Sequence, residues 1–242
     1  MFEKNFLKFF LFFIIVNSNV FPKETPYDIG FWDETPKMAR VIRGGSTEKK
    51  LLALTFDDGP NDSSLLKILE LLKEQEIKAS FFFIGSYIKK YPEETIKAFD
   101  EGHLVLNHTY AHSNFKNSSE DEIFFEISKG NQIIKDVIGK KPKMYRPPYG
   151  VVTKSELQAL GRLDMNLIGW NVDSRDWSKH ETLNSVIEIS KGQIKSGSII
   201  LMHTQPGKMR TYEALKILIP YLKKEGYTFV KLDELLNMEA YQ

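Results

Sequence analysis

Short apolar runs alternate with longer amphipathic segments along most of the chain. Between the short runs, apolar residues recur every three or four positions, which is the spacing of a helix with one buried face. Strands that alternate with helices in this way predict a mainly parallel sheet covered by helices. The runs that we interpret as strands are Leu51–Phe56, Ala79–Ile84, Leu104–Asn107, Lys143–Arg146, Met165–Trp170, Ser198–Met202 and Tyr227–Val230.

The helices are indicated by their spacing and by signals at their ends. One apolar face extends from Leu65 to Leu72, and another extends from Leu215 to Leu222. A longer helix is predicted from Glu120 to Ile138, where Ser119 and Glu122 have the spacing of a capping box. From Leu51 onward the chain is long enough for one barrel-type domain, which we favour over two stacked sheets.

A barrel of this kind gives a test of any candidate site. In such barrels the functional residues lie on the loops that follow the carboxyl ends of the strands. The members of a true site should therefore follow the predicted strands and should not precede them.

The N-terminal residues of the chain differ in composition from the residues that follow them. Lys4 and Lys8 flank the start of a wholly apolar run, residues 9–16, which is far shorter than the ~20 residues that span a bilayer. We predict that residues 1–18 are a cleaved secretory signal peptide, with an uncleaved anchor as the alternative. The proline-containing residues 19–49 are interpreted as a linker or a strap on the domain surface, and residues 50–238 as the main domain.

Composition narrows the chemistry. The formal net charge is +1, so no strong field favours nucleic acid or an anionic membrane surface as a partner. The chain has no cysteine, which excludes disulfides, thiolate ligands and cysteine nucleophiles. A bound metal would need His, Asp or Glu ligands, and this set suits zinc or another first-row divalent ion.

Two polar clusters follow the first and third predicted strands. Asp57 and Asp58 stand beside a Gly-Pro turn, and adjacent carboxylates repel each other unless a cation or an arginine lies nearby. A plain Asp-Gly turn is the alternative. His108 and His112 are four residues apart and would share one face if the segment turned helically. Unrelated surface histidines are the alternative there.

Three more clusters follow the later strands. The prolines after Arg146 make a stiff loop that would place this side chain and present backbone N–H groups, although a rigid connector would look the same. Asp176 lies after the fifth strand and His203 ends the sixth. A carboxylate beside an imidazole fixes its tautomer and raises its proton affinity, whereas a lone histidine at a strand end is often a core residue.

Taken in order, these five segments resemble the five motifs of the polysaccharide deacetylase family, also called the NodB-homology or carbohydrate esterase 4 family. The resemblance extends from about Leu51 to Leu236 and includes every polar motif position. It implies an α/β fold, a distorted (β/α)7 TIM-like barrel of the NodB-homology type. Residues 50–238 would then be the catalytic domain.

The resemblance also implies roles for individual residues. It makes Asp57 the general base that pairs with Arg146, and His203 the general acid that Asp176 orients. The implied metal ligands are Asp58, His108 and His112. The implied substrate contacts are Pro147, the backbone N–H of Tyr149 near the developing oxyanion, and the apolar walls Trp177 and Leu201 around the acetyl methyl group.

The implied function is a metal-dependent deacetylase that hydrolyses the acetamide of N-acetylglucosamine units, with peptidoglycan as the first choice of polymer. A chitin or chitooligosaccharide deacetylase and an O-acetyl-xylan esterase are the alternatives. A non-catalytic glycan-binding protein on this scaffold should have lost a ligand, the base or the acid, and none is missing. Zinc is the expected metal, with cobalt, nickel or iron as alternatives.

Further expectations concern partners and location. We expect a monomer that is secreted or held in the cell envelope or periplasm, with an N-acetylated glycan as substrate and no nucleic-acid partner. After signal cleavage no stable membrane span should remain. The sequence departs from the family pattern after His203, where acidic and glycine residues are usual but Thr204–Lys208 reads TQPGK. We expect this loop to line the sugar groove.

Overall fold

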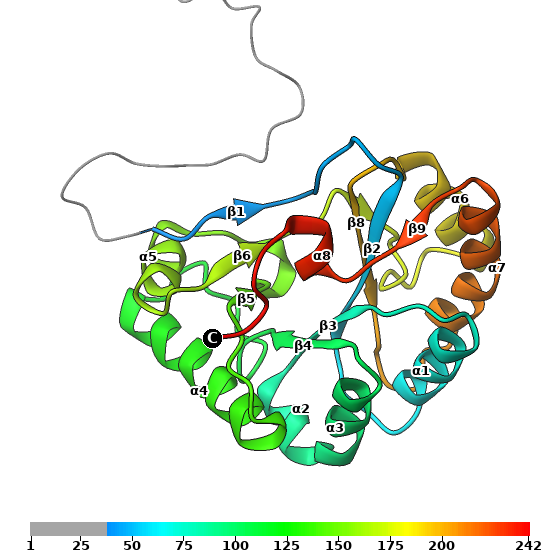
Figure 1. Ribbon diagram of the computed structural model, residues 1–242. Coiled ribbons are helices and arrows are strands. Elements are labelled where there is room, and N and C mark those ends of the chain that lie inside the picture. The colour runs from blue at the N-terminus through cyan, green and yellow to red at the C-terminus, as the bar shows by residue number, and fades with distance from the viewer. Residues whose placement is uncertain (1–37) are drawn as a thin grey trace, which may run out of the picture.

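The computed structural model describes residues 38–242 (Figure 1). The predicted signal peptide, residues 1–18, and residues 19–37 of the predicted linker or strap lie outside the described residues. Within the remainder of that stretch, Val41 and Ile42 are buried and form a strand at the edge of the sheet. Among residues 38–242, no helix is both long and apolar enough to cross a membrane.

The strands of the described residues form one sheet, and every pair in it is parallel. The order is β1-β6-β5-β4-β3-β2-β8-β7, with β9 paired to β2 beside this path. The strands are β1 (Val41–Ile42), β2 (Leu51–Asp58), β3 (Ser80–Phe83), β4 (Leu104–Asn107), β5 (Met144–Tyr145), β6 (Asn166–Ile168), β7 (Val172–Asp173), β8 (Ser198–His203) and β9 (Thr228–Phe229).

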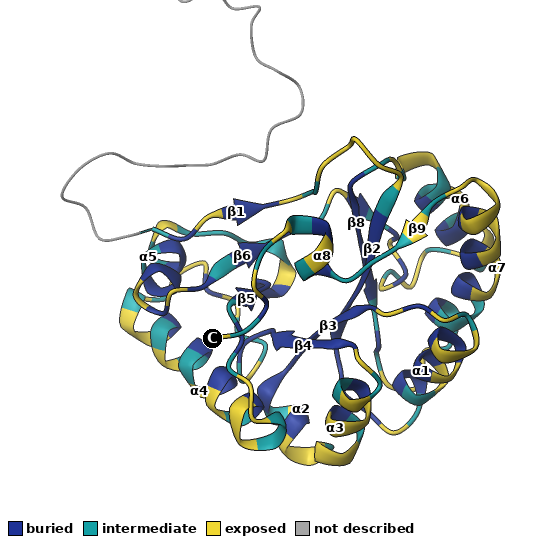
Figure 2. Cartoon of the chain, in the orientation of Figure 1, coloured by how far each residue is buried: buried dark blue, intermediate teal, exposed yellow. Residues whose placement is uncertain are grey.

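The main helices lie around the curled sheet and turn their buried sides toward it (Figures 1 and 2). Helix α4 begins with the predicted capping box, in which the Ser119 hydroxyl accepts the Glu122 N–H and the Glu122 carboxylate accepts the Ser119 N–H. The helices are α1 (Ser64–Glu74), α2 (Gly85–Lys90), α3 (Pro92–Asp100), α4 (Glu120–Ile138), α5 (Lys154–Arg162), α6 (Leu183–Gln193), α7 (Arg210–Lys224) and α8 (Leu232–Leu236).

One continuous stretch of chain joins the two sides of the curled sheet. β6 pairs with β1 and β5, whereas β7, only a few residues later, pairs with β8 at the opposite end of the strand order. The Gly169 N–H donates to the Ile42 carbonyl at 2.7 Å, and the Asn171 N–H donates to the Ile199 carbonyl at 3.3 Å. The sheet therefore curls into a distorted barrel, and the predicted fold class is confirmed.

Apolar side chains fill both faces of the sheet. On β3, Phe81 and Phe83 belong to the cluster that packs against the outer helices, while Phe82 between them belongs to the other side. This alternation is the ordinary period of a strand that is buried on both faces. The side that holds Phe82 also includes Leu232 and Leu235 of α8, which contribute apolar cover to that cluster.

All seven predicted strands are present, most of them shorter than predicted. The stretch predicted as one strand from Met165 to Trp170 contains only β6, and the chain then kinks before β7. Neither β1 nor β7 was expected. Each has two residues, and a run that short carries no period in the sequence, so its pairing is decided by partners far along the chain.

Candidate active site

The polar clusters lie at or directly after the carboxyl ends of β2, β4, β5, β7 and β8, as the barrel prediction requires. They surround a cavity of about 390 Å³. Its lining residues are Asp57, Asp58, His108, His112, Pro147, Tyr149, Gly150, Trp170, Asp173, Trp177, Leu201, His203 and Gln205.

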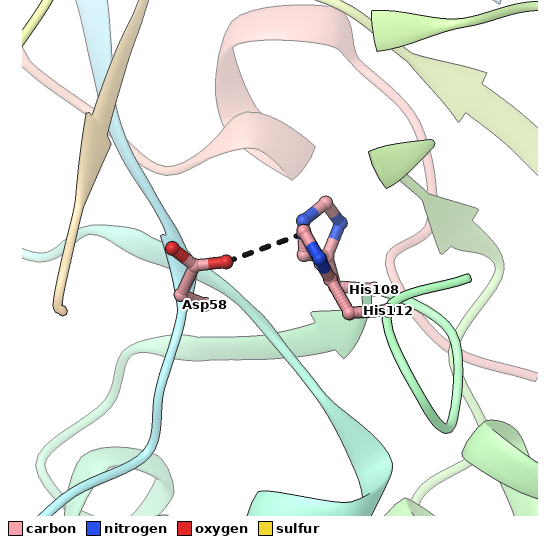
Figure 3. A group of neighbouring side chains, drawn as sticks. All are labelled: Asp58, His108 and His112. Atoms are coloured by element: carbon pink, nitrogen blue, oxygen red, sulfur yellow. Dashed lines mark ion pairs between the residues drawn. The ribbon is translucent and has the colours of Figure 1, made fainter. Parts of the chain in front are cut away.

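Asp58, His108 and His112 bring one carboxylate and two imidazoles together (Figure 3). One potential ligand atom from each residue lies within 4.8 Å of the others, and Asp58 Oδ1 is 3.4 Å from His112 Nε2. His108 Nδ1 is 2.8 Å from the Arg146 carbonyl oxygen, so Nδ1 carries the proton and Nε2 is left as a metal ligand. The three predicted ligands are therefore close enough to hold one ion.

The histidines do not meet through the helical turn that their spacing suggested. The segment is an irregular loop in which Thr109 (φ 63°) and His112 (φ 58°) have left-handed backbone conformations. The Asn107 side-chain oxygen accepts the Thr109 N–H at 2.7 Å, and the Thr109 hydroxyl accepts the His112 N–H at 2.8 Å. These bonds stabilise a conformation that non-glycine residues rarely adopt.

A buried ion pair lies beside the three potential ligands. The Arg146 side chain is fully buried, and its guanidinium donates to Asp57 Oδ1 and to the Thr55 hydroxyl, each at 2.7 Å. The same group donates to the carbonyls of Ile168 and Gly169. Burial raises the pKa of Asp57, and the neighbouring guanidinium only partly opposes that rise. Asp57 Oδ2 is left free toward the cavity, 3.8 Å from His108 Nε2.

On another side of the cavity, Asp176 holds His203. Its Oδ1 is 2.8 Å from His203 Nδ1, and its Oδ2 accepts the His203 backbone N–H at 2.8 Å and the Thr211 hydroxyl at 2.6 Å. Burial disfavours the charged imidazole, but the charge and hydrogen bond of Asp176 outweigh it and raise the pKa of His203 to about 9. His203 is therefore an imidazolium at neutral pH.

The pKa values of the two other histidines of the cavity, His108 and His112, are shifted in the opposite direction. Burial lowers the pKa of His108 to about 3, although Asp58 opposes the shift. Burial also lowers the pKa of His112. Both imidazoles are therefore neutral at physiological pH, which is the form that binds a metal.

The predicted substrate contacts, Pro147, Tyr149, Trp177 and Leu201, all border the cavity. Tyr149 is 65% exposed and Trp177 is 48% exposed, so both aromatic rings are open to a ligand. Tyr149 lies in the short turn Pro148–Gly150 and carries the first N–H of that turn, which has no partner within it, because Pro148 has no N–H. Arg146 and Asp176 do not border the cavity but lie behind Asp57 and His203.

Several lining residues were not singled out from the sequence. Asp173 lies three residues before Asp176 and Gly150 four residues after Arg146, so their position beside these motif residues was a signal that could have identified them. Gln205 belongs to the loop that departs from the family pattern. Trp170 follows β6. The Trp170 ring packs so closely on Gly150 that a Cβ added to this glycine would come within 2.7 Å of it. This contact between residues distant in the sequence places Trp170 at the cavity.

Comparisons with known proteins identify the family of this chain. The family model described as polysaccharide deacetylase matches residues 44–168. A peptidoglycan-N-acetylglucosamine deacetylase of Bacillus cereus is 36% identical over 195 residues, which are 80% of this chain and 70% of the relative.

Two other matches extend the comparison. The peptidoglycan-N-acetylglucosamine deacetylase PgdA of Listeria monocytogenes is 35% identical over 77% of this chain, which spans only 39% of that relative. Among solved structures, the Bc1960 peptidoglycan N-acetylglucosamine deacetylase superimposes with a TM-score of 0.80 at 34% identity, covering 84% of this chain and 95% of that one.

Proposed function

The chain belongs to the polysaccharide deacetylase family, and from this premise we propose that it removes acetyl groups from N-acetylglucosamine units of peptidoglycan. Such an enzyme is a hydrolase of carbon–nitrogen bonds other than peptide bonds, and its products are acetate and a free amine. The observation that carries the proposal is that one cavity is bordered by three potential metal ligands, a carboxylate and a protonated imidazole.

We propose that Asp58, His108 and His112 hold a divalent metal. Their donor atoms lie within 4.8 Å of one another, and the Arg146 carbonyl directs His108 Nε2 to the site. Two imidazoles and one carboxylate suit zinc, and cobalt, nickel or iron can use the same ligands. A bound ion of this kind lowers the pKa of a coordinated water and polarises a carbonyl oxygen.

Asp57 is assigned as the general base that takes a proton from the attacking water. The Arg146 guanidinium donates a hydrogen bond to Asp57 Oδ1, and the other oxygen, Oδ2, is directed at the cavity next to the three potential ligands. Burial raises the pKa of Asp57, which makes this carboxylate a stronger base than an exposed aspartate. Arg146 also offsets the cost of burying the carboxylate as an anion.

His203 is assigned as the general acid. An amide nitrogen leaves poorly as an anion, so it needs a proton as the carbon–nitrogen bond breaks. The pKa of about 9 keeps His203 protonated at neutral pH, and Asp176 fixes the ring through Nδ1 so that Nε2 can donate. The roles of base and acid thus fall to two groups held by separate partners.

The remaining lining residues fit the substrate. The Tyr149 backbone N–H is proposed to donate to the oxygen that becomes negative in the tetrahedral intermediate, and such donors contribute about 3 kcal/mol in other acyl-transfer enzymes. Trp177 and Leu201 are proposed to enclose the acetyl methyl group, and Pro147 to stiffen the cavity wall. The exposed Tyr149 ring is available to a sugar.

Peptidoglycan is the proposed polymer because similar proteins of Bacillus cereus and Listeria monocytogenes are named as its deacetylases. The protein is then expected to act as a monomer outside the cytoplasm, in the cell envelope or secreted. A chitooligosaccharide deacetylase is the second candidate, because a protein of that name from Azorhizobium caulinodans is 30% identical over 80% of this chain.

The test is hydrolysis of three substrates by the purified protein: peptidoglycan fragments, N-acetylglucosamine oligomers and acetylated xylan. Acetate and new amines are measured with a chelator, without it, and after zinc is returned. We expect chelator-sensitive amine release that zinc restores, fastest on peptidoglycan. Acetate release from xylan alone, without any amine, would replace the proposed reaction by an esterase, and no release from any substrate would indicate a glycan-binding protein.

A further inference from the structure

The loop between β8 and α7 reaches back to one of the proposed metal ligands. Gln205 borders the cavity, and its Nε2 donates to Asp58 Oδ2 at 3.1 Å. The other oxygen of the same carboxylate, Oδ1, is directed at His112 Nε2 at 3.4 Å. The two oxygens of Asp58 therefore have different surroundings, and only Oδ1 lies on the side of the histidines.

Gln205 is itself held in one orientation. The Lys208 ammonium donates to Gln205 Oε1, so a flipped amide would place its NH₂ group against a cation. The main chain of the loop is fixed as well, because the Ser64 hydroxyl donates to the Gln205 carbonyl at 2.9 Å. The Asn61 side chain donates to the Thr204 carbonyl, and both of these residues are fully buried.

We infer that Gln205 is a positioning residue that holds Asp58 for ligation of the metal through Oδ1 alone. A hydrogen bond to the oxygen that does not bind the metal fixes the carboxylate plane before the ion arrives. Without it, Asp58 would rotate about χ2, a broad torsion for aspartate, and ordering it would cost part of the binding free energy. The inference rests on the proposed function, since it requires a metal at Asp58, His108 and His112.

The test is the zinc dissociation constant of the full chain and of Gln205→Leu, measured by competition with a chromophoric chelator. Leucine keeps the side-chain volume near that of glutamine but cannot donate. We expect zinc to bind about 10-fold more weakly, the lower end of the effect of removing a partner of a metal ligand. Lys208→Met leaves the amide free to turn and should weaken zinc binding by less, about 2- to 5-fold.

Gln132→Leu is the matched control. Gln132 is exposed on α4 and also donates to an aspartate, Asp136, at 2.6 Å, but that carboxylate is not a proposed ligand. The zinc affinity of the Gln132→Leu variant should equal that of the wild type. Thermal unfolding of the metal-free proteins tests whether Gln205→Leu folds; if it does not, Lys208→Met decides the question, and wild-type affinity in that variant would overturn the inference.

Three results distinguish a failure of the proposed metal site from a failure of the inference about Gln205. A wild-type protein that binds no zinc would overturn the proposed metal site and this inference together. Zinc affinity equal to the wild type in folded Gln205→Leu would overturn the inference alone. Unchanged zinc affinity with a raised KM for the glycan would also overturn it, and would make Gln205 a substrate contact.

Discussion

At the scale of single residues, hydrogen-bond partners fix the orientation and the protonation of the proposed general acid, His203. Asp176 meets His203 through the ring Nδ1 and through the backbone N–H, and Thr211 donates to the same carboxylate. The sequence alone could suggest this pair, because an aspartate and a histidine follow neighbouring motif strands. It could not reveal Thr211, whose bond to Asp176 forms only when α7 packs beside the loop after β7.

The Asp176→Asn variant tests the protonation of His203. Activity requires the imidazolium, so in the wild type it should fall as the pH rises through about 9. Asparagine removes the charge that raises the pKa of His203, and the alkaline limb of the kcat/KM profile should move to lower pH. The exposed Asp136→Asn on α4 is the control and should leave the profile in place. An unmoved limb in Asp176→Asn would remove His203 from the role of acid.

Arg146→Met tests the buried ion pair. The guanidinium is the only cation bonded to Asp57 among the described residues, and its loss leaves a buried carboxylate unpaired. We expect the free energy of unfolding, measured in urea, to fall by about 3 to 5 kcal/mol at neutral pH. Arg162→Met is the control, because Arg162 is an exposed partner of Glu120 and Asp121 and should cost at most about 1 kcal/mol.

At the scale of elements, local signals identified the long helix, and distant partners decided the short strands. Helix α4 has the predicted bounds because its capping box and apolar spacing are local. β6 ends early for a reason that is not local, because the buried guanidinium of Arg146 donates hydrogen bonds to the carbonyls of Ile168 and Gly169. The loop of His108 and His112 similarly depends on Asn107, whose hydrogen bonds replace the helical turn.

The contact between α4 and the histidine loop gives a prediction at this scale. The Asn107 amide donates to Asn131 Oδ1 at 2.7 Å and to the Ile127 carbonyl at 2.9 Å, and an added Cβ on Gly130 would lie 2.8 Å from the same amide nitrogen. Gly130→Ala should therefore displace Asn107 and lower the free energy of unfolding by about 1 to 3 kcal/mol. Zinc binding should also weaken, because Asn107 holds the loop that carries His112.

Gly192→Ala is the matched control for that change. Gly192 is also helical, in α6, but an added Cβ there would have no neighbour within 4 Å. Alanine favours a helix over glycine, so this variant should be as stable as the wild type or up to about 1 kcal/mol more stable. If both alanine variants behaved alike, the contact with Asn107 would not explain the glycine at position 130.

At the scale of the whole molecule, parallel strands explain why the site could be predicted. Their carboxyl ends meet at one end of the barrel, so polar clusters that follow different strands converge whatever their separation in sequence. The same reasoning does not say which residues of a loop turn their side chains into the cavity. Trp170 and Gln205 also follow strand ends, those of β6 and β8, but the kink after β6 and the hydrogen bonds of the loop after β8 decide where their side chains lie.

The last residues of the chain are bonded to β4 and to the segment just before β5. Tyr241 pairs with Pro142, just before β5, and its hydroxyl accepts the Val105 N–H of β4 at 2.9 Å. Tyr241→Phe should lower the free energy of unfolding by about 1 to 3 kcal/mol, because it leaves a buried N–H without an acceptor. The measurement is urea unfolding, and zinc affinity should not change, since this contact does not involve the cavity. A variant as stable as the wild type would contradict this account of the C-terminal residues.

The most direct measurement of the central claim is acetate release by Asp57→Asn with its zinc content determined in the same sample. Asp57 is the proposed base and not a ligand, so the variant should retain one zinc per chain. Its turnover on N-acetylglucosamine oligomers should fall at least ~100-fold, the usual scale for the loss of a general base. Turnover near that of the wild type, with the metal bound, would contradict the proposed chemistry.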